Sequence, residues 1–182
     1  MPTVNDPNGY YQRVDDENRA HVFAVTVSEE HHANKDHLSA YTWQFSDDPD
    51  AADDCIFYLK NNDDRTLVIE GMDFSTADAC GVYVKKGGTG STAAGTAITA
   101  TNVNAGSGNT ADVTCIHDGD VEAGGTFAGS VEFARWTYAA ATDTHNVNFP
   151  LDVIIPKNQV FTIWVDTIGI VVAGTVYGYF HH

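Results

Sequence analysis

Basic residues are scarce in this chain. It carries 9 Lys and Arg residues against 25 Asp and Glu residues, which gives a formal net charge of −16 at pH 7. Nucleic acids and anionic membranes are bound largely through Lys and Arg, so this composition argues against both as unaided partners. Long apolar runs are also missing, and no stretch approaches the roughly 18 apolar residues of a membrane-spanning helix. The polar N-terminus lacks the basic start and apolar core of a secretory signal, so none is expected.

Cysteine is sparse as well. The three cysteines, Cys55, Cys80 and Cys115, are widely spaced, and no Cys-x-x-Cys pair occurs. This pattern argues against a disulfide framework and against a zinc knuckle. We expect three small buried hydrophobic residues in a protein made in a reducing compartment.

Glutamate is rare beside aspartate, with 6 Glu against 19 Asp. Asp favours turns and helix caps whereas Glu favours helices, so this bias indicates a loop-rich β protein. The chain has 182 residues, a length that suits one domain with its own core. We expect a polar N-terminal arm over residues 1–20 and a single β-sandwich domain over residues 21–182.

Runs of alternating or β-branched residues separated by turn residues predict nine to eleven strands. The expected strands are residues 21–27, 39–45, 55–60, 66–74, 81–86, 96–104, 111–117, 126–139, 146–155, 159–167 and 174–182. One short helix is expected over residues 28–38, where Ser28 precedes Glu29 and Glu30. The predicted fold class is all-β, an antiparallel two-sheet β-sandwich of jelly-roll type.

No residue pattern indicates an enzyme, a resident metal or another cofactor. The histidines form no His-x-His pair, and His32 and His37 are five apart, which does not suit a shared metal on one helix. Cys115 and His117 lie on one strand face without an orienting group, and carboxylates are too plentiful to mark a catalytic pair. One acidic loop is a weak candidate for calcium, although it lacks the EF-hand order of ligands. Its carboxylates are Asp47, Asp48, Asp50, Asp53 and Asp54.

Aromatic residues supply the candidate contact surfaces. Tyr10, Tyr11 and Arg13 are two aromatics and a cation in an otherwise polar terminus, so we expect them to anchor the arm on a neighbouring subunit. Trp136 and Tyr138 are further interface candidates on a strand, although core packing is the commoner fate of such residues.

Three stretches carry a resemblance to a known family. They are the segment with Ser28-Glu29-Glu30-His31, the pair CIFYLKNNDDRTLVIEGMDF and the ending FPLDVIIPKNQVFTIWVDT…GTVYGYF. In organisation they resemble the jelly-roll head decoration, or cement, proteins of tailed bacteriophages. The resemblance implies a virion protein made in the host cytoplasm that acts by surface contact. It would form a homotrimer, bind the major capsid protein on the outer capsid surface and clamp neighbouring capsomers.

The same residues leave other roles open. A receptor- or glycan-binding module of a phage fibre or tail is the main alternative, with Trp43, Trp136 and Trp164 as rings that stack on sugars. A minor head–tail component and a non-viral extracellular module are weaker alternatives.

Overall fold

The computed structural model describes residues 3–5, 11–14, 20–21, 28–88, 95–117, 127 and 129–181. For the first three ranges and for residues 142 and 143 only the backbone is described. The expected N-terminal arm contains three short strands, β1 (Thr3–Asn5), β2 (Tyr11–Val14) and β3 (Ala20–His21). They form an antiparallel sheet in the order β1-β2-β3. The remainder of the strand expected at residues 21–27 lies outside the described residues.

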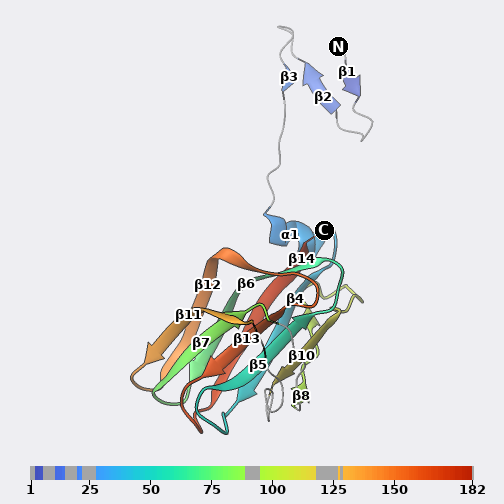
Figure 1. Ribbon diagram of the computed structural model, residues 1–182. Helices are drawn as coiled ribbons and strands as arrows, with labels where there is room; N and C mark the ends of the chain where they lie inside the picture. Colours follow the sequence, from blue (N-terminus) through green and yellow to red (C-terminus); the bar gives the residue numbers. More distant parts are fainter. Residues whose placement is uncertain are drawn as a thin grey trace.

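Two larger antiparallel sheets confirm the predicted β-sandwich (Figure 1). The five-stranded sheet has the order β12-β6-β14-β4-β9 and the six-stranded sheet the order β11-β7-β13-β5-β10-β8. The strands of the first sheet are β4 (Ala40–Asp47), β6 (Thr66–Thr76), β9 (Thr101–Asn102), β12 (Thr142–Ile155) and β14 (Val172–His181). Those of the second are β5 (Asp54–Asn61), β7 (Cys80–Lys86), β8 (Thr96–Ala97), β10 (Val113–His117), β11 (Val131–Tyr138) and β13 (Val160–Val165).

The strand pairing is nested, as in a jelly roll. β4 pairs with β14, β5 with β13, β6 with β12 and β7 with β11, so that early strands pair with late ones. The inserted β9 and β10 extend the sheets beside β4 and β5. The strand expected over residues 96–104 is interrupted: β8 and β9 join different sheets, because this segment crosses from one layer to the other.

The core lies between the two sheets. It is lined by the side chains that face inward from both sheets. Its largest fully buried side chains include Trp43, Tyr41, Phe57, Phe74, Phe161 and Phe180. All three cysteines are buried and free, as the sequence predicts.

One short helix, α1 (Glu29–Lys35), packs beside the end of β14 (Figure 1). Its buried residue is Ala33, which packs against Ala40, Val68 and Tyr179. The helix stops three residues before the expected end, because Asp36 caps it and Leu38 turns the backbone back with a φ of 54°. Among the described residues no helix has the length and apolar character needed to cross a membrane.

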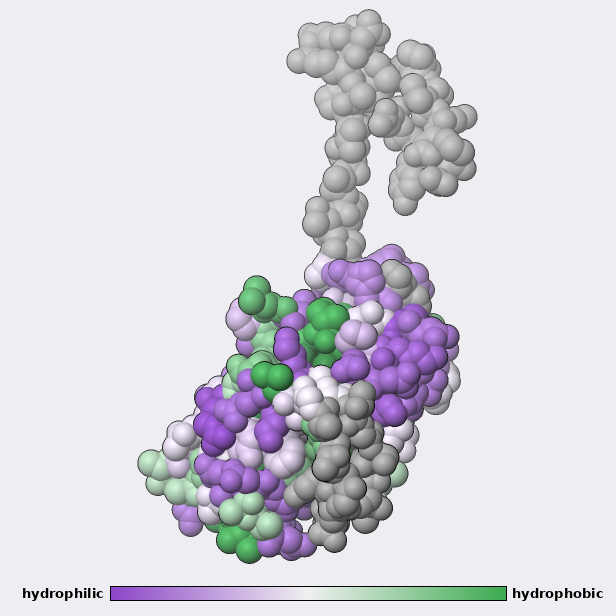
Figure 2. Space-filling view, in the orientation of Figure 1, coloured by the Kyte–Doolittle hydropathy of each residue, from purple (hydrophilic) through white to green (hydrophobic). Residues whose placement is uncertain are grey.

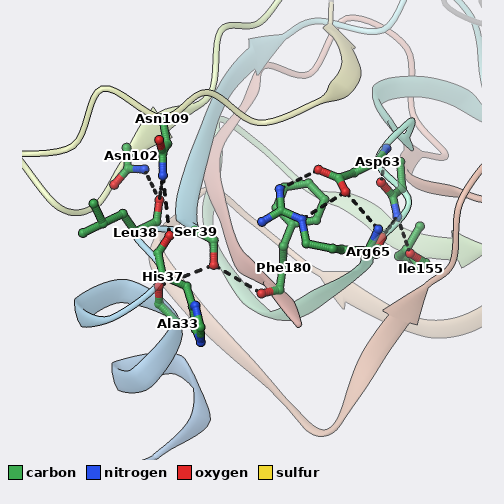
Figure 3. A network of polar contacts seen from close by, with 11 residues as sticks. Ala33, His37, Leu38, Ser39, Asp63, Arg65, Asn102, Asn109, Ile155 and Phe180 are labelled. Atoms are coloured by element: carbon green, nitrogen blue, oxygen red, sulfur yellow. Dashed lines mark hydrogen bonds and ion pairs between the residues drawn. The ribbon is translucent and has the colours of Figure 1, made fainter. Parts of the chain in front are cut away.

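A polar network fixes the end of α1 (Figure 3). The Ser39 hydroxyl donates to the carbonyl oxygens of Ala33 and Phe180, at 3.4 and 3.2 Å. The Leu38 carbonyl accepts from the side-chain amides of Asn102 and Asn109, at 2.8 and 3.3 Å. The helix is therefore tied to β14 and to the loop after β9.

Candidate functional site

A groove of about 560 Å³ lies between α1 and the outward face of the five-stranded sheet. Its walls come from the first turn of α1 and from β4, β6 and β14. The residues that line it include Glu30, His31, Asn34, Tyr41, Glu70, Asp73 and Tyr177. A smaller hollow beside it adds Asn148 and Asp152 and shares Glu30, Glu70 and Tyr177. In Figure 2 hydrophilic residues cover the surface around α1, and hydrophobic patches lie just below them.

Two bulges shape the floor of this acidic groove. The pairing of β14 with β6 shifts between Tyr177 and Gly178, which leaves Glu70 without a partner. The pairing of β12 with β6 shifts in the same place, so residues 149–152 form an excursion from the ladder. Asp152 adopts a positive φ of 44° there. Bulges of this kind re-aim side chains, and here they bring carboxyl groups from two strands toward α1.

The central feature of the groove is the carboxyl pair Glu30 and Glu70. The pKa of Glu70 is raised to about 8, most strongly by burial and then by hydrogen-bond contact with Glu30 and by the charges of Glu30 and Asp152. At neutral pH Glu70 therefore holds a proton, which lets the two carboxyl groups share a hydrogen bond. No Lys or Arg occurs among the described residues that line the groove.

This pair has the wrong geometry for glycoside hydrolysis. Retaining glycosidases hold their two carboxyl groups about 5–5.5 Å apart and inverting ones about 6.5–9.5 Å apart. Glu30 and Glu70 are in hydrogen-bond contact, which leaves no room for a sugar or a water between them.

The Cys115 and His117 pair does not form a nucleophile and base. Cys115 is buried in the core, and its burial raises the pKa of the thiol well above the usual value. The Nδ1 atom of His117 instead lies 3.0 Å from the carbonyl oxygen of Ser46.

The acidic loop is held together by its own hydrogen bonds. A carboxylate oxygen of Asp54 accepts from the backbone amide of Asp50 at 2.9 Å, and Asp53 accepts from the Tyr83 hydroxyl at 3.0 Å. Asp47 accepts from the amide of Asp48 at 2.9 Å. Across the described part of the chain, no three His, Cys, Asp or Glu side chains are placed to hold a metal ion. Asp47, Asp53 and Asp54 therefore serve as structural acceptors.

The candidate interface residues fall into two groups. Tyr10 lies outside the described residues, whereas Tyr11 and Arg13 belong to β2, where they pair with Asn5 and with Thr3 and His21. Trp136 and Tyr138 lie on β11, an edge strand, and are half-buried. Their rings pack against Phe74 of the core, with centroid distances of 6.1 and 5.8 Å.

The Glu30–Glu70 pair is the feature that the sequence analysis missed. Glu30 was expected in the first turn of a helix, and it is there. Glu70 is one of many carboxylates in the sequence, and only the bulge places it under α1. No local sequence signal marks that bulge.

Comparisons of the chain with protein-family models, with curated proteins and with solved structures found no match.

Proposed function

We propose that this chain is a structural virion protein that binds the outer capsid surface and clamps neighbouring capsomers. The observation that carries the proposal is that the N-terminal strands form a sheet of their own, separate from the two sheets of the sandwich. Among the described strands, β1, β2 and β3 pair only with one another, while the jelly roll is complete without them. The N-terminal segment is therefore available for contacts with another subunit.

The fold and the surface chemistry support the same role. Jelly rolls are common among viral capsid and lectin domains, although a fold alone does not define a function. The groove holds an acidic pair in mutual contact, and the candidate nucleophile Cys115 is buried. A net charge of −16 favours solubility of an outward face. Many identical weak contacts on a particle then add through avidity.

In this proposal the N-terminal segment makes the principal contact. Tyr10, Tyr11 and Arg13 supply two aromatic anchors and a cation, the residue types that dominate interface energies. The partner is the major capsid protein, and the chain acts as a homotrimer. Trp136 and Tyr138, at the edge of the six-stranded sheet, are secondary contact residues.

Glycan binding through tryptophan is less well supported, because stacking on a sugar needs an open ring face. Trp43 is fully buried, and Trp136 packs against Phe74. The Lys85 ammonium lies 3.6 Å from the ring centroid of Trp164, whose ring also stacks on Tyr83. All three rings thus have partners within the chain.

The test is an add-back experiment with particles assembled without this chain. Purified full-length chain is added, and bound copies are counted after sedimentation. We expect binding to saturate when about one copy of the chain is bound per major capsid subunit. The double variant Tyr10→Ser, Tyr11→Ser should bind at least about tenfold more weakly, because it removes both aromatic anchors.

Gln12→Ala, at the position directly after the two changed residues, is the matched control and should bind like the unmodified chain. Sedimentation equilibrium should give about three times the 19.6 kDa chain mass for the unmodified chain. Failure of the unmodified chain to bind, or equal binding by the double variant, would overturn the proposed clamp.

A further inference from the structure

Two histidines meet at the end of α1. The Nε2 atom of His32 lies 3.0 Å from the Nε2 atom of His37. Their rings are perpendicular, with an interplanar angle of 89° and centroids 4.6 Å apart. On a continuous helix these residues would point in different directions, but α1 ends at Lys35 and the chain turns back at Leu38. The turn brings the second imidazole over the first.

We propose that His32 and His37 form a binding site for a divalent transition metal that prefers imidazole ligands, with Zn²⁺ as the representative ion. Two Zn–N bonds of about 2.0–2.1 Å at a tetrahedral angle span about 3.3 Å between the nitrogens. The observed separation of 3.0 Å is within a few tenths of an ångström of that span. Zn²⁺, Cu²⁺ and Ni²⁺ all accept imidazole nitrogen, whereas Ca²⁺ and Mg²⁺ prefer oxygen.

Asp36 prepares His32 for this role. Its Oδ2 atom lies 2.7 Å from Nδ1 of His32. A carboxylate at this position holds the proton on Nδ1, so the Nε2 atom presents its lone pair toward His37. This arrangement of carboxylate, histidine and metal is the usual way in which proteins orient an imidazole ligand.

The backbone around His37 is fixed by the polar network of Figure 3. The side-chain amide of Asn109 approaches the carbonyl oxygens of His37 and Leu38, at 3.5 and 3.3 Å. The amide of Ser39 donates to the carbonyl oxygen of Ala33 at 3.0 Å. The backbone does not have to move to bring the two histidines together. Metal binding therefore loses little conformational entropy there.

The surroundings leave room for the remaining ligands. A small cavity of about 50 Å³ is lined by both histidines and by Glu29 and His181. Glu29 and His181 pair with each other at 2.6 Å. No third protein ligand completes the site among the described residues, so water fills the open positions. His32 is 53% exposed, which gives the ion direct access from solvent.

Zn²⁺ would take the place of the hydrogen between the two Nε2 atoms. The hydrogen that links the two Nε2 atoms belongs to His37, and it must move by way of solvent to Nδ1 of that ring. Both rings then stay neutral, and each Nε2 atom offers a lone pair to Zn²⁺. Affinity should fall as the pH drops, because protons compete with Zn²⁺ for the two Nε2 lone pairs.

The test is calorimetric titration of Zn²⁺ into the metal-free full-length chain. We expect one ion per chain, and at least a tenfold loss of affinity in both His32→Ala and His37→Ala. Asp36→Asn should weaken Zn²⁺ binding by about tenfold or more, because it removes the carboxylate that orients the His32 ring. His31→Ala, on the same helix but facing the acidic groove, is the matched control and should bind Zn²⁺ like the unmodified chain. Thermal melting without metal confirms that each variant is folded.

A parallel Cu²⁺ titration followed by electron paramagnetic resonance should show hyperfine splitting from two nitrogen ligands. The variant His181→Ala tests whether the C-terminal histidines bind the ion instead. It should keep most of the affinity for Zn²⁺. The proposal is overturned if millimolar Zn²⁺ gives no binding signal. It is equally overturned if the His32→Ala and His37→Ala variants keep their affinity while His181→Ala loses it.

Discussion

The carboxyl groups of Glu30 and Glu70 are in hydrogen-bond contact across the groove between α1 and β6. One residue comes from the first turn of the helix and the other from a bulge in a strand. Because two ionised carboxylates repel each other at this separation, the helix packs best while the pair holds a proton.

This contact predicts a pH-dependent stability. The pKa of Glu70 rises from 4.5 to about 8 on folding, so the folded chain holds a proton that the unfolded chain has lost between those values. Stability should therefore be fully present below pH 4.5 and should fall as the pH rises toward about 8. Allowing for solvent screening of a half-exposed group, the loss is about 1–2 kcal/mol.

Urea denaturation at both ends of this pH range measures the effect. Glu70→Gln should be more stable than the unmodified chain at the alkaline end and should show a shallower slope with pH. Glu132→Gln, an exposed carboxylate paired with Arg135 at 2.9 Å, is the control and should keep the slope of the unmodified chain. Equal slopes for Glu70→Gln and the unmodified chain would show that the pair does not share a proton.

Strand β6 should not tolerate a side chain at Gly71, the residue after Glu70. A Cβ atom there would meet the backbone carbonyl oxygen of Val147, which belongs to the paired strand β12 and cannot move aside cheaply. We expect Gly71→Ala to lower the free energy of unfolding by about 2 kcal/mol or more. Gly108→Ala, where a Cβ meets nothing within 4 Å, should change it by less than about 0.5 kcal/mol. Similar unfolding curves for the two variants would mean that β6 and β12 are not packed this closely.

The acidic loop should act as a set of structural acceptors. Asp54 is 7% exposed and accepts from the amide of Asp50, so Asp54→Ala should cost about 1–3 kcal/mol by leaving that amide unpaired. Asp48→Ala removes an exposed side chain from the same loop and should cost little. Millimolar Ca²⁺ should leave the melting temperature of the unmodified chain unchanged. A clear rise with Ca²⁺ that disappears in Asp54→Ala would make the loop a calcium site.

The strands were predictable because their residues carry local signals. The run Cys55–Leu59 is apolar, and it lies in β5, a central strand of its sheet whose residues are buried on both faces. Local signals also predicted the start of the helix after Ser28 and the burial of the three cysteines. The nested strand order agrees with the jelly roll expected from the number of strands and the terminal pair.

The sites were not predictable, because they depend on pairing between distant segments. Glu70 enters the groove only through shifts in pairing with β14 and with β12, which lie far along the chain. A spacing of five residues does not suit a shared metal on one helix. The positive φ of Leu38 turns the chain back after the helix ends and brings His37 to His32. Leu seldom adopts this conformation, so no sequence pattern announces the turn.

The most direct test of the proposed function is quantitative mass spectrometry of purified virus particles from the source of this chain. The count of this chain is divided by the count of the major capsid protein in the same particles. A decoration protein predicts a ratio on the order of one, since every capsomer junction is occupied. A ratio of a few per cent would place the chain in a fibre, tail or neck, and its absence from particles would contradict the virion role altogether.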